Sequence, residues 1–132
     1  MARVLADFEG TWLIDRRIVQ RSGPRGRFAG TAQWAPDADG MRYSEVGELE
    51  IEGQPPMHAE RKYRWGRDLT VFFPDGTFFH QVPALGGLAR HWCAPDMYSV
   101  RYRFARWPEF ETVWRVTGPR KDYAMVTRYK RA

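Results

Sequence analysis

The sequence predicts an all-β protein, a single antiparallel up-and-down β-barrel of about ten strands. Turn signals rich in Gly, Pro and Asp recur along the chain at a spacing of roughly 8–14 residues, which is typical of sandwiches and barrels. Between the turns, apolar and polar residues alternate with the period of a half-buried strand. Because no connection is long enough for a crossover helix, we expect consecutive strands to pair, and closure into a barrel would remove exposed edges.

The turn signals divide the chain into strands, and the only helical candidate is a turn within residues 3–8. We expect strands at residues 10–21, 27–35, 41–51, 57–65, 69–73, 77–82, 88–93, 97–105, 109–117 and 122–130. A length of 132 residues is that of one domain. The sequence therefore predicts a single β-barrel domain over residues 1–132.

The first strand carries an arginine on its apolar face. Trp12, Ile14, Arg16 and Ile18 share one side at period two, and the tryptophan marks that side as the core. Burial of an unpaired guanidinium costs several kcal/mol or more. Arg16 is therefore expected to have an internal acceptor, ordered water or an anionic ligand.

The same alternation predicts an aromatic and apolar interior with a polar subset. The polar positions expected inside are Arg16, Tyr43, Glu45, Arg61, Tyr63 and Tyr98. Glu45 can pair with either arginine, and this structural pairing is favoured over an acid–base role beside Arg61 and Tyr63. The clearest division of faces is in the strand at 97–105, where Ser99, Arg101 and Arg103 are expected outside.

Composition narrows the classes of partner. The net charge of +5 comes largely from 18 arginines, but they are spread among carboxylates, which favours ion pairs on a solvated sheet over a nucleic-acid surface. No apolar run approaches the ~20 residues of a membrane helix, and the N-terminus lacks a signal-peptide block. With Cys93 as the single cysteine, we expect a cytoplasmic protein with no nucleic-acid or membrane partner. A homodimer is left open.

Four side chains could carry chemistry. His80, His91, Cys93 and Asp96 are of types that ligate zinc or iron, and His91 and Cys93 face the same way on one strand. No established zinc spacing is matched, so no metal and no cofactor is predicted. His80 is instead expected to be a hydrogen-bonded barrel histidine and Cys93 a small buried residue.

A resemblance to a known family rests on motifs along nearly the whole chain. The motifs are Gly10-x-Trp12, Tyr43-x-Glu45, Phe79-His80, His91-x-Cys93-x-x-Asp96-x-Tyr98 and Gly118-Pro119-Arg120-Lys121-Asp122-Tyr123. The chain resembles an uncharacterised bacterial family of lipocalin-like, or calycin-type, domains of unknown function. The resemblance implies a barrel whose base Trp12 closes, with Arg128 or Arg131 packed across it. Unlike fatty-acid-binding proteins, the chain has room only for a turn between its first two strands, so no helical lid is expected.

These observations favour small-molecule binding in the barrel interior. The expected ligand is apolar or aromatic with an anionic head group. The residues expected to bind it are Arg16, Tyr43, Glu45, Arg61, Tyr63, His80, His91 and Tyr98. The alternatives are an isomerase- or hydrolase-type enzyme, metal-assisted or not, that uses the His80, His91, Cys93 and Asp96 cluster, and a structural module with a filled barrel.

Overall fold

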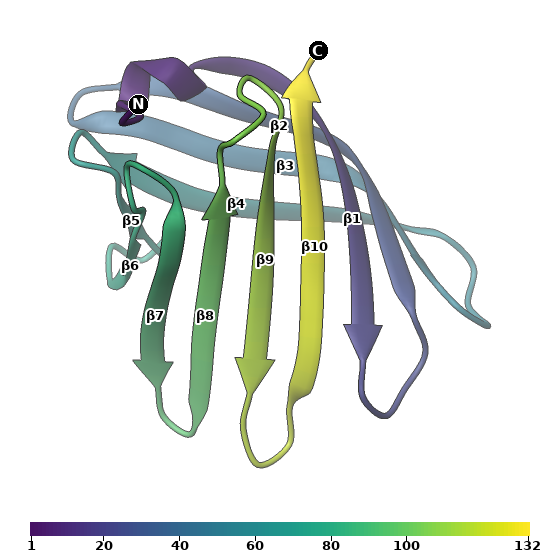
Figure 1. Cartoon of the computed structure of the whole chain (residues 1–132). Helices are drawn as coiled ribbons and strands as arrows, with labels where there is room; N and C mark the ends of the chain where they lie inside the picture. The colour runs from purple at the N-terminus through teal and green to yellow at the C-terminus, as the bar shows by residue number, and fades with distance from the viewer.

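The computed structural model describes residues 1–132 and consists of ten antiparallel strands after one 3-10 turn, η1 (Leu5–Phe8) (Figure 1). The strands are β1 (Gly10–Gln20), β2 (Gly26–Asp37), β3 (Gly40–Ile51), β4 (Met57–Gly66), β5 (Thr70–Phe72), β6 (Phe78–Gln81), β7 (Gly87–Cys93), β8 (Asp96–Arg103), β9 (Phe110–Thr117) and β10 (Asp122–Arg131). Each lies within a few residues of its predicted position. No helix of the chain has both the length and the hydrophobicity to span a membrane.

The strands form one meander whose first and last members meet. The hydrogen-bonded order is β6-β5-β4-β3-β2-β1-β10-β9-β8-β7, so β1 pairs with both β2 and β10. Strands β7 to β10 and β1 lie side by side, and β2 to β4 cross behind them (Figure 1). The ladder is interrupted only between β6 and β7. The predicted fold class, an up-and-down barrel without a helical lid, is confirmed as a nearly closed barrel.

The sheet turns back on itself where two glycines face each other. Gly30 of β2 and Gly47 of β3 are register partners on the inner face. A Cβ added to Gly30 would overlap the Val46 carbonyl, and one added to Gly47 would overlap the carbonyl of Ala29. Only glycine allows backbones to approach this closely, so the pair permits the strong curvature of β2 and β3.

Aromatic side chains close one end of the barrel. Phe8 at the end of η1 and Trp12 at the start of β1 are both fully buried, and the Trp12 indole donates a hydrogen bond to the Phe8 carbonyl at 2.8 Å. Arg131 lies over the Trp12 ring at 4.0 Å and donates to the carbonyls of Asp7 and Glu9 at 2.6 Å. Of the two arginines that the resemblance suggested, Arg131 makes this contact, whereas the exposed Arg128 reaches Glu111 on the outer face.

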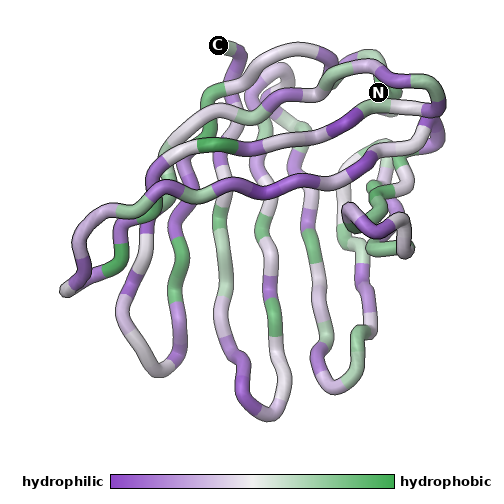
Figure 2. Tube along the Cα trace, turned by 180° about the vertical axis from the view of Figure 1, so that it is seen from behind, coloured by the Kyte–Doolittle hydropathy of each residue, from purple (hydrophilic) through white to green (hydrophobic).

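The inner and outer faces follow the predicted alternation. Hydropathy alternates along the strands in Figure 2. Arg16 and Glu45 are buried as predicted, and Arg101 and Arg103 are exposed. The interior therefore contains a charged pair within an otherwise mostly apolar and aromatic core.

Candidate functional site in the barrel interior

A buried ion pair lies at the centre of the barrel. Arg16 Nη1 and Nη2 donate to the two carboxylate oxygens of Glu45 at 2.9 and 2.6 Å, and Arg16 Nε donates to Thr127 Oγ1 at 2.7 Å. The Tyr43 hydroxyl also donates to Glu45, and it lies 2.8 Å from the Tyr129 hydroxyl. Every nitrogen of the Arg16 guanidinium thus has an internal acceptor, as the sequence required.

Both members of this pair stay charged. Burial alone would raise the pKa of Glu45, but the hydrogen bonds and charge of Arg16, aided by the charge of Arg61, lower it overall. Burial likewise opposes the charge of Arg16, yet Glu45 raises the pKa of the guanidinium above its ordinary value. Because Glu45 is an ionised, multiply hydrogen-bonded acceptor, it is poorly suited to act as a general base.

Arg61 is an inward-facing cation that feels the charge of Glu45 but makes no hydrogen bond or ion pair of its own. It is the register partner of Glu45 on β4, but Glu45 is occupied by Arg16. The Arg61 guanidinium lies over the Trp114 ring at 5.2 Å, and its Nη1 atom is buried without a hydrogen-bond partner. Its side chain is half-buried, and therefore more accessible to solvent than the fully buried Arg16 pair.

Three aromatic rings line the cavity beside the Arg16 pair and also contact less buried inward side chains. Tyr63, Phe79 and Trp114 contact one another, with ring centroids 5.8 Å apart for Tyr63 and Phe79, 6.3 Å for Tyr63 and Trp114, and 5.2 Å for Phe79 and Trp114. We call these three residues the aromatic septum. Beyond it lies the barrel mouth, which we define by the half-buried inward side chains Arg61, His91, Tyr98 and Tyr123.

The space on the core side of the septum is small. A cavity of about 30 Å³ is lined by the Arg16 pair, the septum and neighbouring side chains. Three of its lining residues have buried polar atoms without a hydrogen-bond partner: Trp34 Nε1, His80 Nδ1 and Thr112 Oγ1. A volume of this size admits only one or two water-sized groups. The body of a larger ligand would therefore lie in the mouth or displace the septum.

The residues predicted to act in the enzyme alternative each contact a different partner. His80 Nε2 lies 2.8 Å from the Tyr102 hydroxyl, and burial, with a smaller effect from the charge of His91, lowers the pKa of His80 to about 3. The hydrogen-bonded histidine is confirmed. His91 packs against Phe79 at 5.7 Å, and Asp96 is paired with Lys121 at 3.0 Å.

Cys93 is exposed, so the expectation of a buried cysteine is wrong. It is the last residue of β7, directly before the two-residue turn to β8. No group of three or more His, Cys, Asp or Glu side chains lies close enough together to hold a metal ion.

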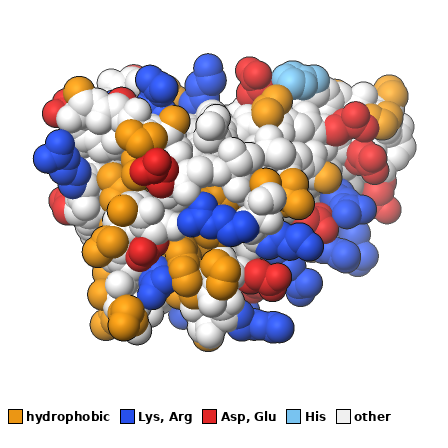
Figure 3. All heavy atoms as spheres, turned by 90° about the horizontal axis from the view of Figure 1, so that it is seen from above, with side chains coloured by type: hydrophobic (Ala, Val, Ile, Leu, Met, Phe, Trp, Pro, Cys, Tyr) orange, Lys and Arg blue, Asp and Glu red, His pale blue; other side chains and the backbone are white.

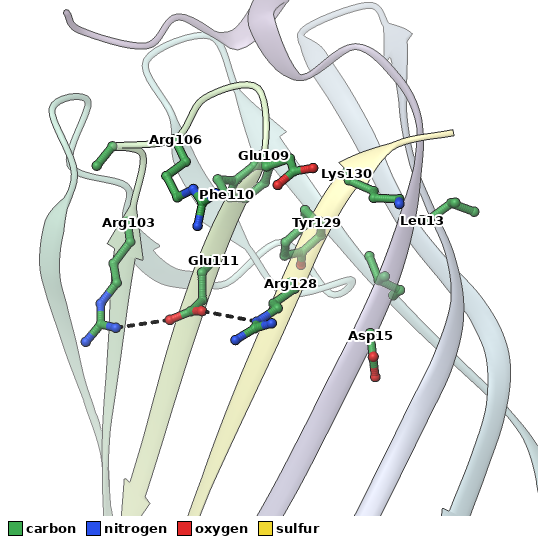
Figure 4. A pocket seen from close by; sticks show the side chains of 12 residues that line it. Leu13, Asp15, Arg103, Arg106, Glu109, Phe110, Glu111, Arg128, Tyr129 and Lys130 are labelled. Carbon is green, nitrogen blue, oxygen red and sulfur yellow. Dashed lines mark hydrogen bonds and ion pairs between the residues drawn. The ribbon is translucent and has the colours of Figure 1, made fainter.

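A groove that the sequence did not reveal lies on the outer face, near the closed end. It has a volume of about 680 Å³ and is lined by residues of β1, β8, β9 and β10 (Figure 4). Its central carboxylate, Glu111, pairs with Arg103 at 3.1 Å and with Arg128 at 3.6 Å. The groove is larger than the inner cavity, but both arginines at its centre already have Glu111 as an ion-pair partner.

Comparisons with known proteins identify the fold and a family. No curated protein matches the chain. The solved structure of the S-type phycobiliprotein lyase CPES from Guillardia theta is similar, with a TM-score of 0.59 and 8% identity over 97% of this chain and 90% of that chain. At this identity the likeness shows the lipocalin-like barrel fold alone. The model of the family of unknown function DUF6314 matches residues 8–131, and the chain therefore belongs to that family.

Proposed function

We propose that the protein binds a small molecule with an aromatic or apolar body and one anionic group, held at the barrel mouth. The observation that carries this proposal is the guanidinium of Arg61, which has no hydrogen-bond acceptor because Glu45 is paired with Arg16. A cation that is partly removed from water and lacks an acceptor is costly, and an anionic group would supply the missing partner. Arg16, the other inward arginine of the sequence-based hypothesis, is already paired with Glu45.

The surroundings of Arg61 suit the rest of such a ligand. The aromatic septum offers ring faces on which a planar body can stack. Burial raises the pKa of Tyr63 and of Tyr123, so both phenols remain protonated hydrogen-bond donors at neutral pH. Tyr98, His91 and the other mouth side chains complete a site that is open to solvent on one side.

A filled barrel with a structural role is the second candidate. It is favoured by the volume of about 30 Å³ behind the septum, which holds no ligand body without rearrangement. In that case Arg61 would serve only to stack on Trp114. The two candidates differ in whether an aromatic anion binds and in whether its binding depends on Arg61.

Titration with 8-anilinonaphthalene-1-sulfonate, a fluorescent aromatic anion, separates them. We expect saturable binding to the wild-type protein, and at least tenfold weaker binding to Arg61→Gln, which corresponds to about 1.4 kcal/mol. Arg42→Gln is the matched control, because Arg42 is an exposed arginine on the outer face of the adjacent strand. Equal affinity of wild type and Arg61→Gln would overturn the proposal, and absence of binding to the wild type would favour the filled barrel. If the wild-type protein binds the dye, native mass spectrometry of freshly purified protein would identify a natural ligand that it retains.

A further inference from the structure

Two parts of the barrel's outer surface, one on β2 to β4 and one on β7 to β9, differ in the balance of positive and negative side chains. On β2 to β4 the outward cations Arg27, Arg42, Lys62 and Arg64 are matched by the outward carboxylates Asp37, Glu48, Glu50 and Glu60. On β7 to β9 the outward cations are Arg90, Arg101, Arg103 and Arg115, and the only outward carboxylate is Glu111. Strands β7 to β9 therefore carry more outward cations than carboxylates, even though Asp122 of β10 pairs with Arg115 at 2.8 Å, whereas β2 to β4 are balanced.

The cationic face also carries exposed apolar side chains. Trp92 is 59% exposed, and it lies directly opposite Met97, which is 37% exposed. Leu88, 39% exposed, lies opposite Arg101, and Arg90 stands between Leu88 and Trp92 on the same side of β7. We call these five residues the Trp92 face. Neither Arg90 nor Arg101 forms an ion pair, in contrast to Arg27 and Arg64 on the other face.

The Trp92 face extends to the end of the barrel that carries the mouth. The β7–β8 turn lies at the end opposite η1 and projects beyond the crossing strands β2 to β4 (Figure 1). Figure 3 views the molecule from the other end, the one that carries η1, and there too hydrophobic side chains gather at one corner with Lys and Arg side chains near them. On the Trp92 face itself, the exposures and the register of β7 and β8 place apolar and basic side chains together on one surface.

We propose that the Trp92 face docks on an anionic lipid surface. Arg90 and Arg101 would contact the phosphate oxygens of head groups, which guanidinium groups bind in a bidentate geometry. Trp92 would lie at the level of the head groups, with Leu88 and Met97 reaching the acyl chains. Electrostatic attraction of basic residues to an anionic leaflet would add to this apolar burial.

The aliphatic members of the face favour a lipid surface over a nucleic acid. Leu88 and Met97 gain from contact with hydrocarbon, but they offer no ring for base stacking. The sequence-based expectation of no membrane partner rested on the lack of a long apolar run, which docking at the surface does not require. Docking would bring the barrel mouth to the membrane, so an apolar ligand could pass between the two with little exposure to water.

Co-sedimentation with lipid vesicles tests the proposal. We expect the wild-type protein to pellet with phosphatidylcholine vesicles that contain about 30% phosphatidylglycerol, and to be released by salt because surface charge attraction is screened. Trp92→Ser/Met97→Ser and Arg90→Gln/Arg101→Gln should each lower the bound fraction at least fivefold. Arg42→Gln/Lys62→Gln, on the balanced face, should bind as the wild type does.

Failure to pellet with the anionic vesicles, or wild-type binding by both Trp92-face variants, would overturn the proposal. Binding to single-stranded RNA that weakens with the same substitutions, without any vesicle binding, would assign the face to nucleic acid instead. All four changed positions are on the outer face, so circular dichroism and the binding of 8-anilinonaphthalene-1-sulfonate should remain unchanged. These controls separate the failure of this proposal from a failure of ligand binding at the mouth.

Discussion

Arg16 and Glu45 illustrate how a buried charge is accommodated at the residue scale. Strand alternation alone predicted both side chains inside and identified Glu45 as an acceptor. It did not predict which arginine Glu45 would choose, because Arg16 comes from β1 and Arg61 from β4, and the choice depends on the curvature of the sheet between them. Glu45 pairs with Arg16, and Arg61 is left without an ion pair or a hydrogen-bond acceptor.

His80 makes stability depend on pH. Its pKa is about 3 in the folded state and 6.5 for an exposed histidine, so the ring is neutral when folded. As pH falls below 6.5, the unfolded chain binds a proton that the folded protein does not, and the free energy of unfolding decreases until about pH 3. With 1.36 kcal/mol per pKa unit, the loss approaches about 5 kcal/mol.

Urea unfolding of His80→Gln at several pH values would measure this effect. We expect the free energy of unfolding of the variant to fall less steeply than that of the wild type between pH 6.5 and 4. His58→Gln is the control, because His58 is an exposed histidine on the outer face. Parallel curves for the wild type and His80→Gln would show that His80 does not cause the acid sensitivity.

At the scale of elements, η1 is held to the barrel by the burial of Phe8 in the aromatic core and by contacts from the end of β10. Arg131, next to the C-terminus, satisfies the carbonyls of Asp7 and Glu9 and covers Trp12. The resemblance suggested this contact but left Arg128 and Arg131 as alternatives. Strand period separates them, because Arg131 is the register partner of Trp12 whereas Arg128 pairs with the outward Asp15.

Arg131→Ala should lower the free energy of unfolding by about 2 kcal/mol, since it removes two charge-assisted hydrogen bonds and a cation–π contact at a solvent-accessible site. Arg128→Ala is the control and should cost no more than about 0.5 kcal/mol, because its ion pair with Glu111 is exposed. Chemical unfolding followed by tryptophan fluorescence measures both. Equal losses would show that Arg131 does not hold η1 in place.

The positions of the strands were predictable from the sequence because turn signals are local. The contacts between strands were not predictable in this way. The Asp and Gly residues of the turns mark where each strand begins and ends, independently of the rest of the chain. The contact of Gly30 with Gly47 depends on how closely the two backbones approach, and the alternation of side chains carries no information about that distance. The exposure of Cys93 likewise depends on where its hairpin ends relative to the neighbouring strands.

At the scale of the whole molecule, the interrupted ladder between β6 and β7 distinguishes this barrel from a fully closed one. Strands β1 and β10 each have two hydrogen-bonded neighbours, while β6 and β7 each have one. The sequence predicted closure in general terms, because an up-and-down meander brings its ends together. It carried no signal for the position of the gap, which depends on the accumulated twist of all ten strands.

Hydrogen exchange should follow this asymmetry. We expect amide protons of β1 and β10 to exchange slowest and those of β6 and β7 to exchange at least tenfold faster, because strands with a single partner open at lower free energy. Exchange read by NMR or by mass spectrometry of proteolytic fragments measures the difference. Uniform protection of all ten strands would indicate that β6 and β7 are joined in solution.

The aromatic septum has a consequence for how this family can diversify. Side chains on the core side, such as Arg16 and Glu45, are tied to folding, and their replacement endangers the whole chain. Side chains on the solvent side, such as His91 and Tyr98, contribute less to the packed core. Substitutions at the mouth should therefore cause only a small loss of stability. Descendants of one ancestral barrel could acquire new ligand specificities while the interior stays unchanged.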